Sequence, residues 1–216
     1  SHNRKELEEL ISQITVNETF FHRDISQFHF LRNVVFPALA QNNVIEILSL
    51  ACATGEEPHS VAMELCEFFG ENFGNKIINI TGCDIDKEAL NKCVAERYSA
   101  DSRKLQNLPK TYLAKYFDYK DDYFTVADKI KKKTRFYNLN IIRDKFPNNN
   151  YDIIFCKNVM MYFPKHTQNQ LIKKITDALN ADAYLFIGAT EIIENLPNNL
   201  IKIPSVPSVY RKCCGV

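Results

Sequence analysis

The sequence predicts an α/β protein built on a doubly wound, mostly parallel β-sheet. Short apolar runs rich in β-branched residues alternate with longer segments of helical periodicity, which is the order of βαβ units. The first apolar run, 44–52, leads through a turn of small residues into a helical pattern, as in nucleotide-binding βα units. The 216 residues suffice for one ordinary domain with a small addition.

Each expected strand is an apolar stretch bounded by turn residues. The run 44–52, for example, lies between Asn42-Asn43 and the turn at Thr54-Gly55. Strands of the main sheet are expected at 44–52, 76–86, 134–140, 151–163 (which runs into a turn) and 183–190, with an edge pair in the tail at 201–214. Helices are expected at 4–14, 28–43, 59–74, 87–99, 109–117 and 164–180.

The middle of the chain interrupts this alternation. The segments 122–128 and 134–140 are short and alternating, and the basic run KIKKK at 129–133 separates them. The first segment is expected in a small antiparallel sheet, and the second is expected to return to the main sheet. The lysine run is interpreted as a solvent-exposed face or a turn.

Composition and charge exclude several classes of protein. The net charge of +1 gives no basic footprint for nucleic acid, and no apolar run reaches the ~18 residues of a transmembrane helix. The first residues do not resemble a secretory signal peptide, and the seven cysteines have no zinc-binding spacing. We therefore expect a cytoplasmic protein with reduced cysteines and no metal, which neither inserts into membranes nor binds nucleic acid.

The turn ACATGEEPHS at 51–60 has the layout of a nucleotide-binding turn without its chemistry. Its one glycine, Gly55, matches neither GxGxxG nor GxxxxGKS/T, so a pyrophosphate held by backbone amides is disfavoured. Glu56 and Glu57 follow at once. One glutamate can serve the helix dipole, but the pair in this turn favours a ligand with an ammonium or sulfonium group.

Polar residues end the other predicted parallel strands as well, at Asp84, at Asn138 and in the stretches CKN and GATE. Ligands of doubly wound sheets bind outside the carboxyl ends of the strands, so these residues are site candidates. Asp84 can accept hydrogen bonds from two ribose hydroxyls, whereas Asp86 is better placed to cap the next helix. S-Adenosylmethionine carries a ribose, an ammonium and a sulfonium but no phosphate, and it fits this set.

Several motifs together resemble the CheR family, the methyltransferases that esterify glutamate side chains of bacterial chemotaxis receptors. The resemblance covers about residues 15–210 and implies a class I methyltransferase fold with S-adenosylmethionine as cofactor. The matching stretches are NETFFHRD at 17–24, ATGEEPHS at 53–60, GCDIDKEALNKC at 82–93, NL at 138–139, IIFCKNVMMYF at 153–163 and FIGATE at 186–191.

The resemblance implies roles for individual residues. Asp84 would bind the ribose, Asn138 and Leu139 would flank the adenine, and Tyr162 would lie beside the transferred methyl group. The implied cofactor-binding residues are Asn17, Thr19, Arg23, Glu57, Asp84, Asn138, Leu139, Lys157 and Asn158, and the implied catalytic residues are Arg23 and Tyr162.

Five positions depart from the family pattern. Lys157 stands where the family usually has Arg, and it keeps the charge without the bidentate fork. His22 replaces a Phe, His59 replaces a Tyr, and Ala189-Thr190 replaces His-Ser. The two histidines are interpreted as packing or local polar residues. Because the implied catalytic residues are kept, an active enzyme is expected.

The resemblance also implies a domain organisation. Residues 1–40 are interpreted as a helical segment, the remnant of or linker from a helical domain, and 41–216 as the methyltransferase domain with a small β-subdomain at about 100–137. Family members that dock on a receptor's C-terminal pentapeptide have a glycine-lengthened loop there, and DYKDD at 118–122 has no glycine. A pentapeptide-independent, monomeric enzyme acting on the cytoplasmic domain of receptors is implied.

A glutamate acceptor is ionised at pH 7 because its ordinary pKa is ~4.3, so in-line methyl transfer needs no general base. Alignment and partial desolvation of the carboxylate would then supply the catalysis. Arg23 would hold one carboxylate oxygen while the other attacks, and Tyr162 would orient the methyl group or the carboxylate. The alternatives are a surface salt bridge from Arg23 to Asp24 or Glu18, and Tyr162 as a core aromatic.

Three other functions stay open. The chain could be a methyltransferase of the same fold with a different acceptor, or a non-catalytic sensor of S-adenosylmethionine or its demethylated product. The third is a dinucleotide oxidoreductase, which the missing GxGxxG disfavours.

Overall fold

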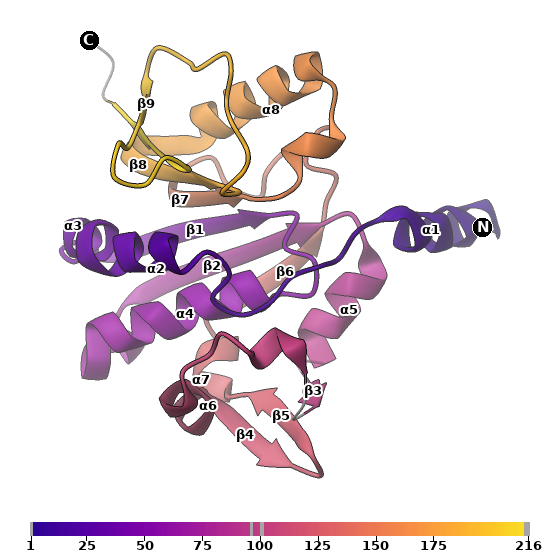
Figure 1. Cartoon of the computed structure of the whole chain (residues 1–216), viewed down its shortest axis with the longest axis vertical. Coiled ribbons are helices and arrows are strands. Elements are labelled where there is room, and N and C mark those ends of the chain that lie inside the picture. Colours follow the sequence, from indigo (N-terminus) through magenta and orange to yellow (C-terminus); the bar gives the residue numbers. More distant parts are fainter. Residues whose placement is uncertain (1, 96, 100–101, 214–216) are drawn as a thin grey trace.

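A seven-stranded sheet forms the centre of the molecule in the computed structural model, which describes residues 2–95, 97–99 and 102–213 (Figure 1). The strand order is β6-β2-β1-β7-β8-β10-β9. β10 pairs antiparallel with both β8 and β9, and the other pairings in this sheet are parallel. The strands are β1 (Val44–Leu50), β2 (Ile77–Asp84), β6 (Thr134–Asn138), β7 (Tyr151–Cys156), β8 (Leu179–Ile187), β9 (Leu200–Lys202) and β10 (Val209–Lys212).

The strands that follow β1 in sequence, β2 and β6, lie on one side of it, and the later strands β7 and β8 lie on its other side. The switch point therefore lies between β1 and β7, where a doubly wound sheet binds its ligand. This topology confirms the predicted fold class, including the return of residues 134–140 to the main sheet and the edge pair in the tail.

Both faces of the sheet are covered. On β7, Ile153 and Phe155 belong to one apolar cluster and Ile154 and Cys156 to another. The first cluster includes residues of α4 (Glu56–Phe69), and the second includes residues of α8 (Lys165–Ala178). Complete burial of β7 explains why its sequence is a continuous apolar run, as is typical of a central parallel strand.

Helical residues 25–39 form α2 (Ile25–Phe30), a π-helical turn η1 (Leu31–Val35) and α3 (Phe36–Leu39). One helix was predicted over 28–43, so the segment begins and ends earlier than expected. Likewise α4 begins at Glu56, three residues before its predicted start, and η2 (Gly70–Gly74) follows it.

Two predicted boundaries were wrong because long-range contacts prevail over local helical periodicity. The helix expected at 87–99 ends as α5 (Lys87–Ala95), and β3 (Arg97–Ser99) pairs with another strand instead. The aromatic ring of Tyr98 lies 5.1 Å from that of Phe21. The helix expected to reach residue 180 ends at Ala178, because Leu179 already pairs with Tyr151 in the main sheet.

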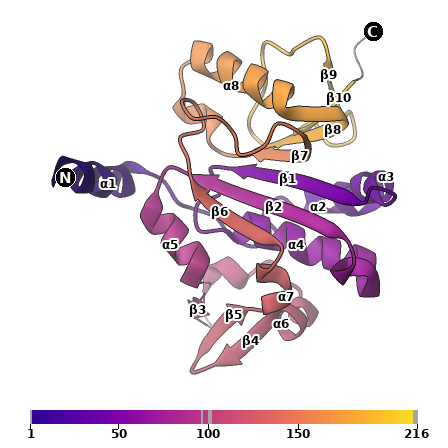
Figure 2. The ribbon, with the colours of Figure 1, turned by 180° about the vertical axis from the view of Figure 1, so that it is seen from behind.

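The small antiparallel sheet has the order β3-β5-β4 and lies beyond α4 and α5 (Figures 1 and 2). It contains β4 (Phe117–Lys120) and β5 (Tyr123–Val126). β5 confirms the prediction that the segment 122–128 belongs to a small antiparallel sheet. Its neighbours are η3 (Arg103–Leu105), α6 (Lys110–Tyr116) and α7 (Asp128–Lys131). The first part of the lysine run thus belongs to a short helix, in which Ile130 is buried.

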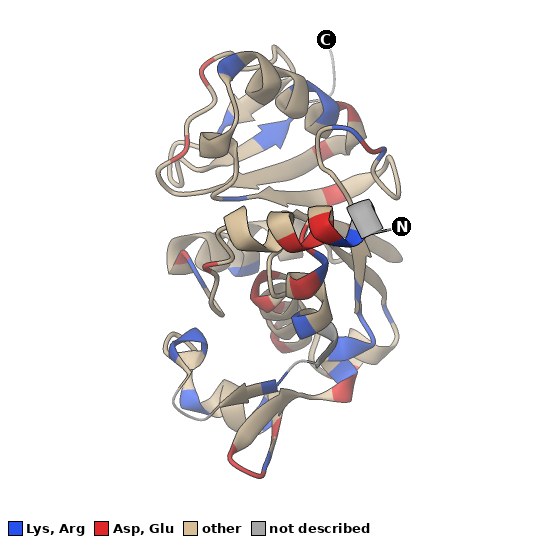
Figure 3. Ribbon diagram, turned by 90° about the vertical axis from the view of Figure 1, so that its right-hand side faces the viewer, with Lys and Arg blue, Asp and Glu red and all other residues tan. Residues whose placement is uncertain are grey.

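Helix α1 (His2–Ile14) extends away from the carboxyl edge of the sheet, and acidic residues gather on it (Figures 1 and 3). Its predicted apolar stripe is largely exposed, with Leu7, Leu10 and Ile14 each more than half accessible. Among the residues described, no helix has both the length and the apolar character needed to cross a membrane. The six described cysteines are free thiols, and Cys214 lies outside the described residues.

Gly55 is required by the backbone at the turn after β1. Its φ is +89°, and an added Cβ would lie 3.0 Å from Cys93 Sγ and 3.1 Å from the Phe136 ring. Gly74 has open space around it and no left-handed φ.

We expect Gly55→Ala to lower the free energy of unfolding by about 1–3 kcal/mol. Gly74→Ala is the matched control and should change it little; equal urea midpoints for the two variants would contradict this account.

Candidate active site

A cavity of about 550 Å³ opens at the carboxyl edge of the main sheet, next to the switch point. It is bounded by the ends of β1, β2 and β7 and by the N-terminal segment 14–20. Most of the site residues predicted from sequence line this one cavity: Asn17, Thr19, Arg23, Glu57, Asp84, Leu139, Lys157, Asn158 and Tyr162.

Asn138 is the predicted site residue that is not among those lining the cavity. Its side-chain amide donates hydrogen bonds to the backbone carbonyls of Asp84 (3.1 Å) and Ile85 (2.8 Å). Asn138 therefore fixes the backbone after β2 directly, and its neighbour Leu139 contributes the cavity surface.

In the turn after β1, every second residue has a left-handed backbone, with φ of 55° at Ala51, 50° at Ala53 and 89° at Gly55. Left-handed backbone is unfavourable for alanine, so this turn holds strain of the kind that collects at functional sites. Its conformation is fixed by Ala53 N–H, which donates to Asp84 Oδ2 at 2.8 Å.

The Asp84 carboxylate is buried and shared between two loops. Oδ2 accepts from Ala53 N–H, and Oδ1 accepts from Asp86 N–H at 2.9 Å. Burial raises the pKa of Asp84, against the opposing effect of these backbone hydrogen bonds. Each oxygen keeps a further acceptor position, so the group can still receive hydroxyl donors from the cavity.

Asp86 connects the N-terminal segment to the loop that follows Asp84. Its carboxylate accepts hydrogen bonds from the side chains of Ser12 (2.5 Å), Thr15 (3.0 Å) and Asn17 (2.7 Å). It also accepts from Glu88 N–H and Ala89 N–H, which confirms the predicted cap of α5. The sequence pointed to the cap only, because Ser12 and Thr15 lie more than seventy positions away in the chain.

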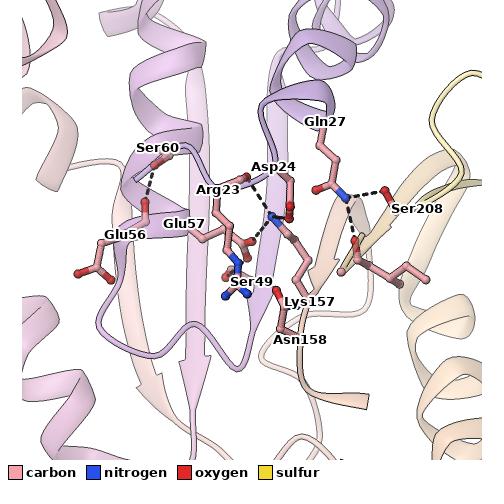
Figure 4. Close-up of polar contacts among 12 residues, drawn as sticks. Arg23, Asp24, Gln27, Ser49, Glu56, Glu57, Ser60, Lys157, Asn158 and Ser208 are labelled. Carbon is pink, nitrogen blue, oxygen red and sulfur yellow. Dashed lines mark hydrogen bonds and ion pairs between the residues drawn. The ribbon is translucent and has the colours of Figure 1, made fainter. Parts of the chain in front are cut away.

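The buried side chain of Lys157 lines the cavity, and its ammonium lies between two carboxylates (Figure 4). Nζ is 3.0 Å from Asp24 Oδ2 and 3.3 Å from Glu57 Oε2, and it donates to the carbonyl of Arg23 at 3.4 Å. Glu57 also accepts from Ser49 Oγ at 2.8 Å. With two acids and one cation, this cluster keeps a negative charge that can receive a positively charged ligand.

Glu56 is directed away from this cluster, although it precedes Glu57. Its fully buried carboxylate accepts from Thr54 Oγ1 at 2.7 Å and pairs with Lys104 Nζ at 2.6 Å. It lies in the first turn of α4, where a negative charge complements the helix dipole. The two glutamates of the turn thus differ, as expected: one supports the helix start and the other lines the cavity.

Arg23 and Tyr162 both reach the cavity. The Arg23 guanidinium donates to the backbone carbonyl of Glu18 at 2.9 Å, and the Asp24 carboxylate is paired with Lys157. No surface salt bridge from Arg23 to the Glu18 or Asp24 side chain is present among the described contacts. Tyr162, at the end of η4 (Met160–Tyr162), is 58% exposed and is not a core aromatic.

The two histidines are structural residues, as predicted. Burial, with the charge of Lys131, lowers the pKa of His59 to about 3, so this ring stays neutral against Phe136. His22 Nε2 lies 2.8 Å from Glu64 Oε1 in a buried cluster.

Glu191, the last residue of the GATE stretch, was missed as a supporting residue. Its carboxylate accepts hydrogen bonds from the backbone N–H groups of Asn158 (2.8 Å), Met160 (2.9 Å) and Gly188 (2.8 Å). It therefore holds the loop that carries Asn158 and Tyr162. Its place after a strand end, in a motif already singled out, was the signal available in the sequence.

Known proteins share this sequence pattern. Residues 17–209 match the family described as CheR methyltransferase, SAM binding domain. A chemotaxis protein methyltransferase of Borreliella burgdorferi is 38% identical over 96% of this chain and 74% of its own length. Chemotaxis protein methyltransferase Cher2 of Pseudomonas putida is 30% identical over 94% of this chain and 75% of its own length.

A solved S-adenosylmethionine-dependent methyltransferase from Clostridium acetobutylicum is similar with a TM-score of 0.41 and 14% identity. The match covers 86% of this chain and 55% of that protein's chain. The family match spans most of the residues between the N-terminal helix and the last strand, including all the cavity residues predicted from the sequence. The chain belongs to the CheR methyltransferase family.

Proposed function

We propose that this protein transfers the methyl group of S-adenosylmethionine to glutamate carboxylates of chemotaxis receptors, giving methyl esters. One observation carries the proposal: a cavity combines a buried carboxylate at a strand end with a cluster of net negative charge. The turn beside it is not of the phosphate-binding type. Asp84, Glu57 and Lys157 line the cavity, and Asp24 completes the cluster by pairing with Lys157. The names of the relatives, chemotaxis protein methyltransferases, support the receptor as acceptor.

The cavity residues fit S-adenosylmethionine in size and chemistry. Asp84 would accept from the ribose hydroxyls, because its oxygens keep free acceptor positions. Ile85, Leu139 and Ile141 give the apolar surface that an adenine needs. Glu57, with its partner Lys157, would face the amino-acid end, and the cluster's net negative charge suits an ammonium and a sulfonium.

S-Adenosylmethionine supplies a methyl group on a positively charged sulfur. The acceptor carboxylate is already ionised, so this chain has no proton to remove. Arg23 would hold one oxygen of that carboxylate by a charge-assisted hydrogen bond, leaving the other free to attack. Tyr162, exposed at the cavity rim, would align the acceptor, and the apolar lining would reduce its hydration.

The small sheet supports a pentapeptide-independent mode of action on the cytoplasmic domain of the receptor. Lys120 ends β4 and Tyr123 begins β5, so only Asp121 and Asp122 form the turn. Both are left-handed, with φ of 51° and 61°, which is the geometry of a tight two-residue hairpin. This short turn has no lengthened loop for a receptor tail. We also propose that the enzyme acts as a cytoplasmic monomer.

Incubation with labelled S-adenosylmethionine and receptor-containing membranes tests the function. We expect label in the receptor band, released as methanol by mild base because methyl esters are base-labile. Label that withstands base would mean a different acceptor atom. Cofactor binding without any transfer would favour the non-catalytic sensor.

Asp84→Asn should weaken S-adenosylmethionine binding about 10- to 100-fold, since a hydrogen bond to a charged group contributes about 1.5–3 kcal/mol. Calorimetry measures this, with Asp177→Ala as a control, because Asp177 pairs with Lys173 on exposed α8. An unchanged dissociation constant would refute the ribose assignment.

Acidification should also weaken cofactor binding by the wild-type protein, because protonation removes the Asp84 acceptor. Since burial raises the pKa of Asp84, the loss on lowering pH should begin above the range of an ordinary aspartate, ~3.9. Asp84→Asn should abolish this component, and a wild-type affinity that is flat over the same pH range would contradict it.

Arg23→Ala should lower kcat about 100-fold and Tyr162→Phe about 10-fold, because both side chains align the acceptor. Each variant should weaken cofactor binding by less than this. Tyr119→Phe on the remote β4 is the matched control, as its hydroxyl contacts Asp122. Near-normal turnover in both site variants would remove the roles given to these two side chains.

A further inference from the structure

Arg23 lies between two residues with left-handed backbone. The φ angles are 53° at His22 and 64° at Asp24. Such conformations cost about 1–3 kcal/mol each in a residue with a side chain, and they persist only where surrounding contacts enforce them. A side chain in the middle of such a turn points in a direction that a relaxed chain would rarely choose.

His22 is fixed on one side of this turn. Its Nε2 lies 2.8 Å from Glu64 Oε1, and its backbone N–H donates to Ser60 Oγ at 3.0 Å. Glu64 is 1% exposed and is held in turn by Arg32, at 2.6 Å, and by the Tyr112 hydroxyl, at 3.0 Å. Residue 22 is therefore anchored to α4 through a fully paired buried carboxylate.

Asp24 is fixed on the other side. It occupies the N-cap position of α2, where an aspartate normally accepts from backbone N–H groups of the first turn. Its carboxylate makes no such bond and instead lies 3.0 Å from Lys157 Nζ (Figure 4). The capping contact is absent, and the carboxylate contributes a buried ion pair to the end of β7.

We propose that His22 and Asp24 are positioning residues that together direct the Arg23 guanidinium into the cavity. The His22–Glu64 and Asp24–Lys157 pairs are named the Arg23 clamp. The clamp enforces left-handed backbone on both sides of Arg23, so the guanidinium is oriented before the acceptor arrives. This inference rests on the proposed function, in which Arg23 holds the acceptor carboxylate.

The two pairs of the Arg23 clamp hold the turn through different elements of the fold. Glu64 belongs to α4, whereas Lys157 follows β7, so the turn is held between two elements of the main domain. Within the part of the chain that the structure describes, the Arg23 side chain makes one hydrogen bond, to the carbonyl of Glu18. Its guanidinium carbon lies 5.5 Å from the centroid of the Phe20 ring. Its own contacts are thus weaker than those of its two neighbours.

Asp24→Gly separates positioning from plain stability, because glycine accepts a left-handed φ without strain but removes the pair with Lys157. At saturating S-adenosylmethionine, we expect kcat to fall about 10- to 100-fold, as for a small misplacement of a catalytic group, while the melting temperature is kept. Asp121→Gly is the matched control: it relieves the same backbone conformation in the distant hairpin and should leave turnover unchanged.

The second arm is a double-mutant cycle. At saturating S-adenosylmethionine, where a change in cofactor affinity does not count, Asp24→Gly or His22→Leu should lower kcat by less than about twofold when Arg23 is already alanine, because each acts through Arg23. His22→Gln, whose amide can replace Nε2, should restore much of the activity that His22→Leu loses. Equal losses with and without Arg23 would overturn the proposal, since they would mean that Lys157 or the fold carries the effect.

A third readout needs no acceptor. In nitrogen-15 spectra, the Nε–Hε signal of Arg23, assigned with Arg23→Ala, should report an ordered side chain in the wild type and a mobile one in Asp24→Gly and His22→Leu. An equally ordered signal in the variants would refute the clamp whatever the enzyme methylates. Absence of receptor methylation by the wild type would refute the proposed function and leave this measurement decisive for the clamp.

Discussion

One buried ammonium, that of Lys157, holds together the segments that form the active site. It contacts Asp24 from the N-terminal segment and Glu57 from α4, and it follows β7 in the chain. Removing the cation would leave the carboxylates of Asp24 and Glu57 without a partner and with little water to screen them. The resulting loss of stability would exceed the net contribution of the ion pairs themselves. The N-terminal segment, the turn after β1 and the end of β7 therefore depend on one another.

Backbone strain is concentrated in the same place. Ala51, Ala53 and Asn158 line the cavity with left-handed φ, and His22 and Asp24 flank Arg23 with the same conformation. Carboxylates at or just after the ends of strands supply the contacts that enforce it: Asp84 at the end of β2 holds Ala53, and Glu191 in the loop after β8 holds Asn158. A rigid, well-packed sheet thus supports a preorganised rim, which suits a reaction that depends on alignment and needs no proton transfer.

The sequence was sufficient for the parts of the molecule that follow local pattern. Apolar runs located the parallel strands, and polar residues at their ends located Glu57 and Asp84 in one cavity. It was insufficient where distant residues decide. The pair His22–Glu64 joins positions 42 residues apart, and the bond Ser12–Asp86 joins positions 74 apart. Residues 97–99 likewise leave the helical pattern because a strand partner lies further along the chain.

The central claim is that the carboxyl edge binds a positively charged, phosphate-free adenosine ligand. Calorimetric titration of the wild-type protein with S-adenosylmethionine and with NAD⁺, under one set of conditions, tests it most directly. The account predicts that S-adenosylmethionine binds at least about 100-fold more tightly, since the acidic cluster attracts the first and repels the pyrophosphate of the second. Equal affinities, or tighter binding of NAD⁺, would contradict it.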